Sequence, residues 1–224
     1  MRDPDIPIDQ VSGVEERPQN RREWSGALRS LVLPVLIVAA IVGVLLYVDR
    51  LRGGSTPASD GYGIVELPAS LNTTGRSVSS DVGRAAPDFR LRTPDGGDLR
   101  LSDLRGHPVL VNFWASWCIP CRQEMPEIVR AYAAHRDAGL QIVAVDLQEN
   151  ADQVRGFADE FGMTFPIAID RTGAVASAWR IGGPIKGIPS SYFLDADGVV
   201  RARAFGPLTA QSLSDNLATI GVQP

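Results

Sequence analysis

An uncharged apolar run near the N-terminus is the longest hydrophobic feature of the chain. Leu31 to Val48 contains no charged residue. At about 1.5 Å per residue, a helix over this run spans roughly 27 Å, close to a hydrocarbon core of about 30 Å. The run predicts one transmembrane helix, with Pro34 in its first turn, where proline is tolerated. A cleaved signal peptide or a buried core helix fits less well, because the apolar region of a signal peptide has roughly 7 to 15 residues.

The segments on either side of this run predict its orientation. Residues 1–30 are polar with mixed charges and predict a disordered tail. Arginines lie close to both ends of the run, but the larger number precedes it: Arg17, Arg21, Arg22 and Arg29 before, Arg50 and Arg52 after. This bias predicts a single-pass signal anchor at residues 31–48, with a cytoplasmic N-terminus and the rest of the chain extracytoplasmic. Residues 49–84, rich in Gly, Ser, Thr, Pro and Asp, predict a flexible linker.

Short apolar segments alternate with helical patterns from residue 85 onward. The pattern predicts strands over 109–114, 141–145, 165–169, 191–194 and 199–204, and helices over 151–161, 175–180 and 209–220. A helix after the first strand is indicated by the apolar stripe Met125, Ile128, Val129 and Tyr132. This order predicts an α/β domain over residues 85–224, with a mixed central sheet covered by helices.

Composition and charge narrow the function. The 224 residues include 26 acidic and 22 basic side chains, and the basic residues form no stripe of the kind that follows phosphates, so a nucleic-acid partner is not expected. The chain has two cysteines, Cys118 and Cys121. With no other thiol present, thiol redox chemistry has to use this pair.

The two cysteines lie where a predicted strand gives way to a predicted helix. The N-terminus of a helix offers unpaired N–H groups and the positive end of the helix dipole, which lower the pKa of Cys118 below the usual value of about 8.5. Cys118 is therefore the expected attacking thiol, and Cys121 resolves the mixed disulfide. A zinc half-site or a purely structural bridge fits less well, because zinc needs four ligands and neither His107 nor His135 is well placed.

Three segments carry a family resemblance. They resemble the TlpA/ResA/CcmG group of membrane-anchored thioredoxins, which have an AhpC/TSA-redoxin type domain. The segments are Gly83-Arg84-Ala85-Ala86-Pro87-Asp88-Phe89, Leu101-Ser102-Asp103-Leu104-Arg105-Gly106 and Val111-Asn112-Phe113-Trp114-Ala115-Ser116-Trp117-Cys118-Ile119-Pro120-Cys121-Arg122-Gln123-Glu124-Met125-Pro126. The resemblance covers about residues 83–220 and implies a thioredoxin fold with thiol chemistry at the cysteine pair.

The resemblance also implies roles for residues outside the pair. Glu124 matches an acid that takes and returns the proton of Cys121, whereas a first-turn acid on its own is more often a partner of the helix dipole. Asn112 stands where cytoplasmic thioredoxins carry a buried aspartate. Ile188 and Pro189 resemble a loop whose cis-proline faces the disulfide and whose preceding residue pairs with a substrate strand. Trp117, beside the nucleophile, is expected to line the substrate surface.

The dipeptide between the cysteines predicts the direction of the reaction. Ile119-Pro120 supplies no charge to stabilise a thiolate, which predicts a reducing pair with a potential nearer to about −270 mV than to about −120 mV. The resemblance then implies reduction of protein disulfides, above all the CxxCH cysteines of apocytochrome c. It also implies a membrane electron donor of the CcdA or DsbD type. The redox-active disulfide itself is the expected reactive group, with no separate cofactor and no metal.

Three other functions remain open at this point. A general extracytoplasmic disulfide reductase uses the same chemistry on a wider set of substrates. A peroxiredoxin-like peroxidase fits less well, because the residues before Cys118 are Phe113-Trp114-Ala115-Ser116-Trp117 rather than a Pro-x-x-x-Thr-x-x-Cys loop. A tethered binding module with a merely structural pair would not reduce insulin.

Overall fold

The structure is a computed structural model that describes residues 34–44, 61–181 and 187–223. The chain divides into two compact units, Met1–Ala58 and Ser59–Pro224. In the first unit, residues 34–44 of the predicted apolar run form a helix with exposed side chains. Among the described helices, none combines the length and the apolar character needed to cross a membrane. The predicted tail and the two ends of the predicted span lie outside the described residues.

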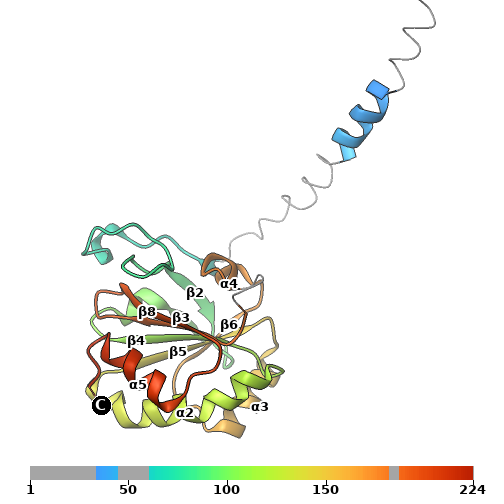
Figure 1. The fold of residues 1–224 in the computed structure, drawn as a ribbon. Coiled ribbons are helices and arrows are strands. Elements are labelled where there is room, and N and C mark those ends of the chain that lie inside the picture. The colour runs from blue at the N-terminus through green and yellow to red at the C-terminus, as the bar shows by residue number, and fades with distance from the viewer. Residues whose placement is uncertain (1–33, 45–60, 182–186, 224) are drawn as a thin grey trace, which may run out of the picture. The chain divides into compact units, whose positions relative to one another are not determined.

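One mixed sheet forms the centre of the second unit (Figure 1). Its eight strands in the described residues are β1 (Gly63–Ile64), β2 (Phe89–Arg92), β3 (Asp98–Arg100), β4 (Val109–Trp114), β5 (Gln141–Leu147), β6 (Ile167–Asp170), β7 (Ser190–Leu194) and β8 (Val200–Phe205). They follow the order β1-β2-β6-β5-β4-β7-β8, and β3 pairs with β2. The pairs β4/β5 and β5/β6 are parallel, whereas β4/β7 and β7/β8 are antiparallel.

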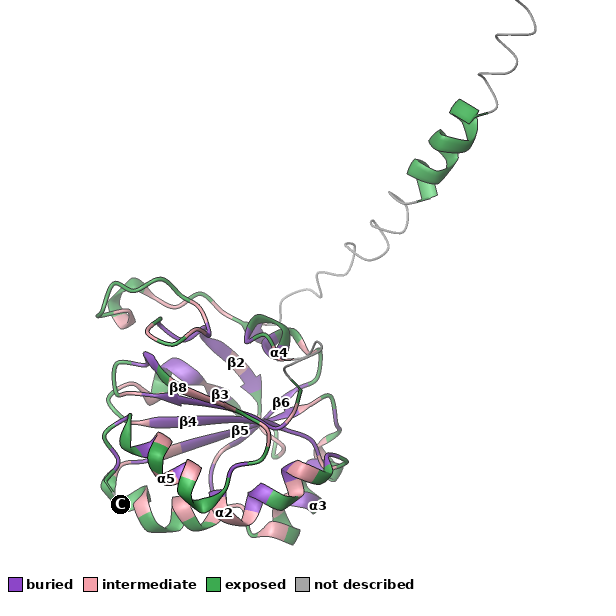
Figure 2. Ribbon diagram, viewed as in Figure 1, coloured by how far each residue is buried: buried purple, intermediate pink, exposed green. Residues whose placement is uncertain are grey.

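Helices cover both faces of this sheet, as Figure 1 shows. The α-helices of the second unit are α2 (Ile119–His135), α3 (Ala151–Phe161), α4 (Ala174–Ala178) and α5 (Ala210–Ala218), with short 3₁₀ turns at Ala69–Leu71, Leu101–Leu104 and Arg136–Ala138. Side chains of α2, α3 and α5 pack with one face of the sheet, and those of α4 and β2 pack with the other. Burial follows this layering, since the central strands are buried and the outer helix faces are exposed (Figure 2). The architecture is the thioredoxin-like α/β fold that the sequence predicted.

Residues 61–84 differ from the linker that composition predicted. β1 pairs with β2, and the Gly83 N–H donates to the Val200 carbonyl at 2.7 Å. The guanidinium of Arg92 lies 4.3 Å from the centre of the Tyr62 ring. The segment is therefore held by backbone bonds, the Tyr62 ring and the ion pairs of Asp81 with Arg180 and Arg203 rather than by an apolar stripe. Such contacts leave no periodic pattern in the sequence.

The strand and helix that carry the cysteines match the predicted positions. β4 is buried at all six positions and lies between β5 and β7, in the middle of the sheet. Elsewhere the predicted bounds shift by a few residues, since the strand expected at 165–169 is β6 and the helix expected at 175–180 is α4. The loop after β4 and the start of α2 therefore sit on a rigid, central support.

Candidate active site

Cys118 and Cys121 form a disulfide at the start of α2, with the two sulfur atoms 2.07 Å apart. Cys118 is the N-cap residue, and its Sγ accepts the backbone N–H of Cys121 at 3.2 Å. Pro120 lies in the first turn, where its missing N–H costs no helical bond. Cys118 is 4% exposed and Cys121 is fully buried. A substrate sulfur can therefore reach Cys118 more easily than Cys121, in agreement with the predicted roles.

Exposed apolar side chains flank the disulfide. Trp117 is 67% exposed and Ile119 is 70% exposed, whereas Cys118 between them is nearly buried. Large apolar side chains are usually buried at least in part. Trp117 is exposed beside Cys118, and its contact with the substrate stays a prediction. Ile119, which the sequence analysis did not assign, is exposed on the other side of Cys118.

The peptide bond between Ile188 and Pro189 is cis, as the resemblance implies. Ser190, the first residue of β7, pairs with Phe113 in β4, so Pro189 lies beside the end of β4 from which the cysteine loop leaves. The Ile188 side chain packs against the cluster that contains both cysteines. The structure therefore brings this loop to the same end of the sheet as the disulfide.

Glu124 is fully buried on the inner face of α2, three residues after Cys121. Its Oε1 accepts the Asn112 side-chain amide at 2.7 Å, and its Oε2 accepts the Leu208 N–H at 2.7 Å. Burial raises the pKa of Glu124 to about 7, although both hydrogen bonds act to lower it. A carboxyl with that pKa exchanges a proton near neutral pH, which is the property that a proton acceptor for Cys121 needs.

Asn112 holds Glu124 from the neighbouring strand. Its side-chain amide also donates to the Ser191 hydroxyl at 3.0 Å, and both residues are fully buried. The uncharged amide of Asn112 adds no charge that would shift the pKa of Glu124, whereas an aspartate at this position would place a second carboxyl beside it. Ser191 is a part of this arrangement that the sequence analysis missed, because only the β4/β7 pairing brings it to Asn112.

A second group of polar residues lies on the β5 side of the cysteine loop. Glu149 accepts two hydrogen bonds from Ser116, and Asp146 at the end of β5 accepts the backbone N–H of Glu149. The sequence analysis did not single out any of the three. Their signal was the position of Asp146 at the carboxyl end of a strand parallel to β4 and of Glu149 just after it, since the carboxyl ends of parallel strands meet at one edge of a sheet.

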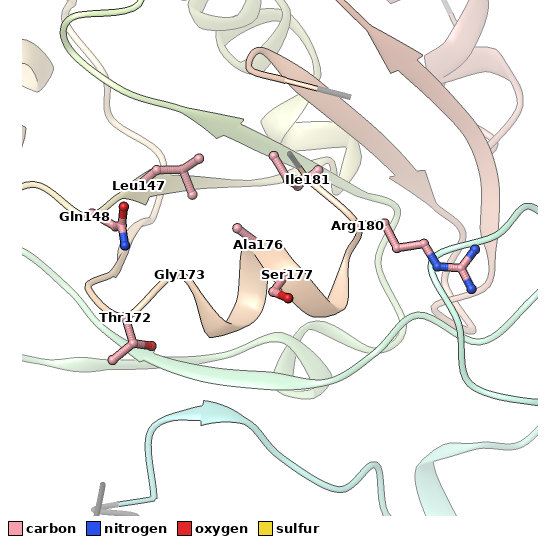
Figure 3. Close-up of a pocket in the computed structure, with 8 residues that line it drawn as sticks. All are labelled: Leu147, Gln148, Thr172, Gly173, Ala176, Ser177, Arg180 and Ile181. Carbon is pink, nitrogen blue, oxygen red and sulfur yellow. The ribbon is translucent and has the colours of Figure 1, made fainter. Parts of the chain in front are cut away.

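A cavity of about 450 Å³ lies at the ends of β5 and β6, beside α4 (Figure 3). Gln148 and Thr172 line one end, and the Arg180 side chain extends away from them, as Figure 3 shows. Neither cysteine lines this cavity. In the described part of the chain, no cluster of three or more potential metal ligands is present. The side chains exposed beside the reactive pair are Trp117 and Ile119.

The fold and the disulfide at the start of α2 together define a thioredoxin-like redox protein. The chain belongs to the AhpC/TSA family, whose family model matches residues 82–203. It is a thiol:disulfide oxidoreductase, as its similarity to curated relatives shows.

The relatives agree on this chemistry. The thiol-disulfide oxidoreductase ResA of Geobacillus kaustophilus is 39% identical over 139 residues, which cover 62% of this chain and 78% of the relative. The thioredoxin-like protein YneN of Bacillus subtilis is 38% identical over 145 residues, which cover 63% and 82%. A crystal structure of a putative thiol:disulfide interchange protein DsbE from Chlorobium tepidum is 33% identical with a TM-score of 0.57, and the match covers 63% of this chain and 99% of that one. Protein disulfides are therefore the substrate class.

Proposed function

We propose that this chain is an extracytoplasmic, membrane-anchored reductase that keeps the CxxCH cysteines of apocytochrome c reduced before haem is attached. The observation that carries the proposal is the buried Glu124, held by Asn112 and Leu208 one turn behind Cys121. The uncharged Ile119-Pro120 dipeptide supports the reducing direction. The apolar run at residues 31–48 supports a membrane anchor.

The proposed reaction moves two electrons from the dithiol to the substrate. The Cys118 thiolate attacks one sulfur of the substrate disulfide and forms a mixed disulfide, while the other substrate sulfur leaves as a thiolate and takes a proton. Ionised Glu124 accepts the proton of the Cys121 thiol. The Cys121 thiolate then attacks Cys118 Sγ, and the second substrate thiolate leaves and is protonated. The protein ends as the Cys118–Cys121 disulfide seen in the structure.

Regeneration requires a reductant outside the protein. In an oxidising compartment the disulfide does not reduce itself, so a membrane thiol donor of the CcdA or DsbD type is proposed to return two electrons to the pair. The alternative with the same chemistry is a general reductase of extracytoplasmic disulfides. A peroxidase reaction has less support, because the Trp-rich segment before Cys118 differs from a peroxidatic loop.

Deleting the gene is expected to lower the amount of covalently bound haem in membranes, because oxidised CxxCH cysteines cannot form thioethers. A small permeant thiol in the medium should restore haem attachment. Haem staining of membrane proteins after electrophoresis measures both effects. Expression of the wild-type chain should complement the deletion, and expression of Cys118→Ser should not. Full cytochrome c levels in a deletion strain without a redundant thioredoxin-like protein would contradict the role in haem attachment. The general disulfide reductase would then be the remaining function.

The topology has a separate test. A reporter that is active only in the cytoplasm is expected to be inactive when it is fused after residue 60, because the arginine bias predicts that the following domain is outside. The same reporter fused to the N-terminus should be active, which controls for expression. Strong activity of the fusion after residue 60 would contradict the extracytoplasmic location without affecting the thiol chemistry.

A further inference from the structure

Glu149 fixes the residue that lies two positions before Cys118. Its Oε2 accepts the Ser116 backbone N–H at 2.5 Å, and its Oε1 accepts the Ser116 hydroxyl at 2.5 Å. The Cys118 N–H in turn donates to the Ala115 carbonyl at 3.1 Å. The short segment from Ala115 to Cys118 is therefore held by the Glu149 bonds at Ser116 and by the backbone bond between Cys118 and Ala115. The position of Cys118 thus depends on the position of the Glu149 carboxylate.

Asp146 holds Glu149 in turn. The Asp146 side chain is fully buried at the end of β5, and its Oδ1 accepts the Glu149 N–H at 3.1 Å. Gln148 adopts a left-handed conformation with φ of 67°, which is uncommon for a residue other than glycine. This conformation turns the chain so that Glu149 comes back to Asp146. A strained backbone of this kind persists where surrounding contacts hold it.

The buried carboxyl of Asp146 has one oxygen without a partner. In the part of the chain that the structure describes, its Oδ2 has no hydrogen-bond partner. Two ionised carboxylates offer each other no donor, so a bond between the side chains of Asp146 and Glu149 requires one proton. A proton on Asp146 satisfies that atom and leaves the negative charge on Glu149, where the two Ser116 donors receive it.

Burial favours this placement of the proton. Together with the neighbouring Glu149 side chain, it raises the pKa of Asp146 to about 8. Burial also acts to raise the pKa of Glu149, but the hydrogen bonds from Asp146 and Ser116 hold it below the usual value for a glutamate.

We propose that Asp146 is a positioning residue of this oxidoreductase: as a neutral acid it donates to Glu149, and so keeps the Glu149 carboxylate on Ser116 and the Cys118 loop in its reactive position. The proposal rests on the proposed role of Cys118 as the attacking thiol, and it does not depend on the identity of the substrate.

The charged and titratable groups around the pair are few. From α2, the same side of the sheet carries the two cysteines and Glu124, which is bound by Asn112 and Leu208. From α3, the buried residues are Val154 and Phe157, which carry no charge. Asp170 at the end of β6 directs its Oδ2 to the Ala176 N–H at 2.7 Å. Among these groups, Glu149 is thus the acid that directly affects the protonation of Asp146.

Carboxyl titration by NMR in the oxidised full-length protein tests the shared proton. The carboxyl carbon of Asp146 is expected to report the protonated acid at pH 7 and to titrate near pH 8, while that of Glu149 is expected to titrate at a lower pH than an ordinary glutamate. Ionisation of Asp146 in the usual range of an aspartate would overturn the proposal.

Alkylation of the reduced full-length protein tests the link to Cys118. In the wild type, the rate of Cys118 labelling should rise with pH as the thiol ionises. Above pH 8 the rate should be about twofold lower than a single ionisation curve gives, because the new charge on Asp146 disfavours the thiolate and weakens the hold on Ser116. Asp146→Asn keeps a donor for Glu149 and cannot ionise, so it should match the wild type at pH 7 and follow a single curve. Asp152→Asn, which removes a charge nearby, should keep the wild-type profile.

Two outcomes separate the proposal from its premise. Superimposable profiles for the wild type and Asp146→Asn would overturn the positioning role even if the NMR titration finds the shared proton. Peptide mapping that finds the label first on Cys121 would overturn the assignment of the attacking thiol, and with it the proposed order of the thiol reaction.

Discussion

Replacing Cys118 with serine is expected to abolish disulfide reduction by the full-length protein. A serine hydroxyl does not ionise near neutral pH, so no nucleophile remains at the entrance of α2. Cys121 does not replace it, because its side chain is fully buried. Reduction of insulin disulfides with a chemical reductant as electron source measures the loss.

The matched variant is Cys121→Ser. In this variant Cys118 should still attack the substrate disulfide, but the reduced substrate should not be released. Its Cys118 thiolate is expected to form a mixed disulfide that persists because nothing resolves it, and mass spectrometry of the trapped adducts would identify substrates. In the reduced wild type, alkylation near neutral pH should label Cys118 before Cys121. Mixed disulfides that form through Cys121 in the Cys118→Ser variant would reverse the two roles.

Replacing Glu124 with glutamine is expected to slow reduction by about 10 to 1000-fold. Glutamine can keep hydrogen bonds at this buried position but cannot accept the proton of Cys121. The loss should grow as the pH rises through 7, where wild-type Glu124 ionises and becomes an effective base. Glu127→Gln is the control, since Glu127 lies one turn further along α2 and pairs with Arg130 at the surface. Equal rates for Glu124→Gln and the wild type would reduce Glu124 to a structural acid.

The same variant has a stability signature whose sign follows from the raised pKa. Below pH 4.5 the carboxyl is protonated in both the folded and the unfolded chain, and between pH 4.5 and about 7 only the folded chain keeps the proton. The stabilisation that this proton provides is therefore lost as the pH rises through 7, by up to about 3 kcal/mol. Urea unfolding of the oxidised protein should show a smaller decrease between pH 5 and pH 8 for Glu124→Gln than for the wild type.

The sequence was informative wherever one local pattern determined the structure. The apolar strand pattern before Cys118 and the apolar stripe after Cys121 predicted β4 and α2, and the strand patterns at 191–194 and 199–204 predicted β7 and β8, because each pattern belongs to a single element. The resemblance added the cis peptide bond before Pro189, which local pattern does not indicate.

The contacts that pairing creates were not predictable in this way. Ser191 reaches Asn112 only through the register of β4 and β7, and Glu149 reaches Ser116 only because β5 lies parallel to β4. Residues 61–84 were missed for a related reason, since their Gly-rich composition is typical of a linker while their backbone bonds attach them to the sheet. The composition of a segment reflects its own conformational preferences. The contacts above form between two segments that are distant in the sequence, so neither segment indicates them alone.

The exposed side chains of Trp117 and Ile119 are expected to favour some reaction partners of Cys118 over others. Attack on a disulfide requires a sulfur to approach in line with the S–S bond, and the Cys118 sulfur is almost covered at the centre of an apolar rim. A small hydrophilic thiol such as glutathione gains nothing from that rim, whereas a polypeptide can bury both side chains and hold its own sulfur in place. We therefore expect the cysteine pair to exchange faster with docked polypeptides than with small hydrophilic thiols.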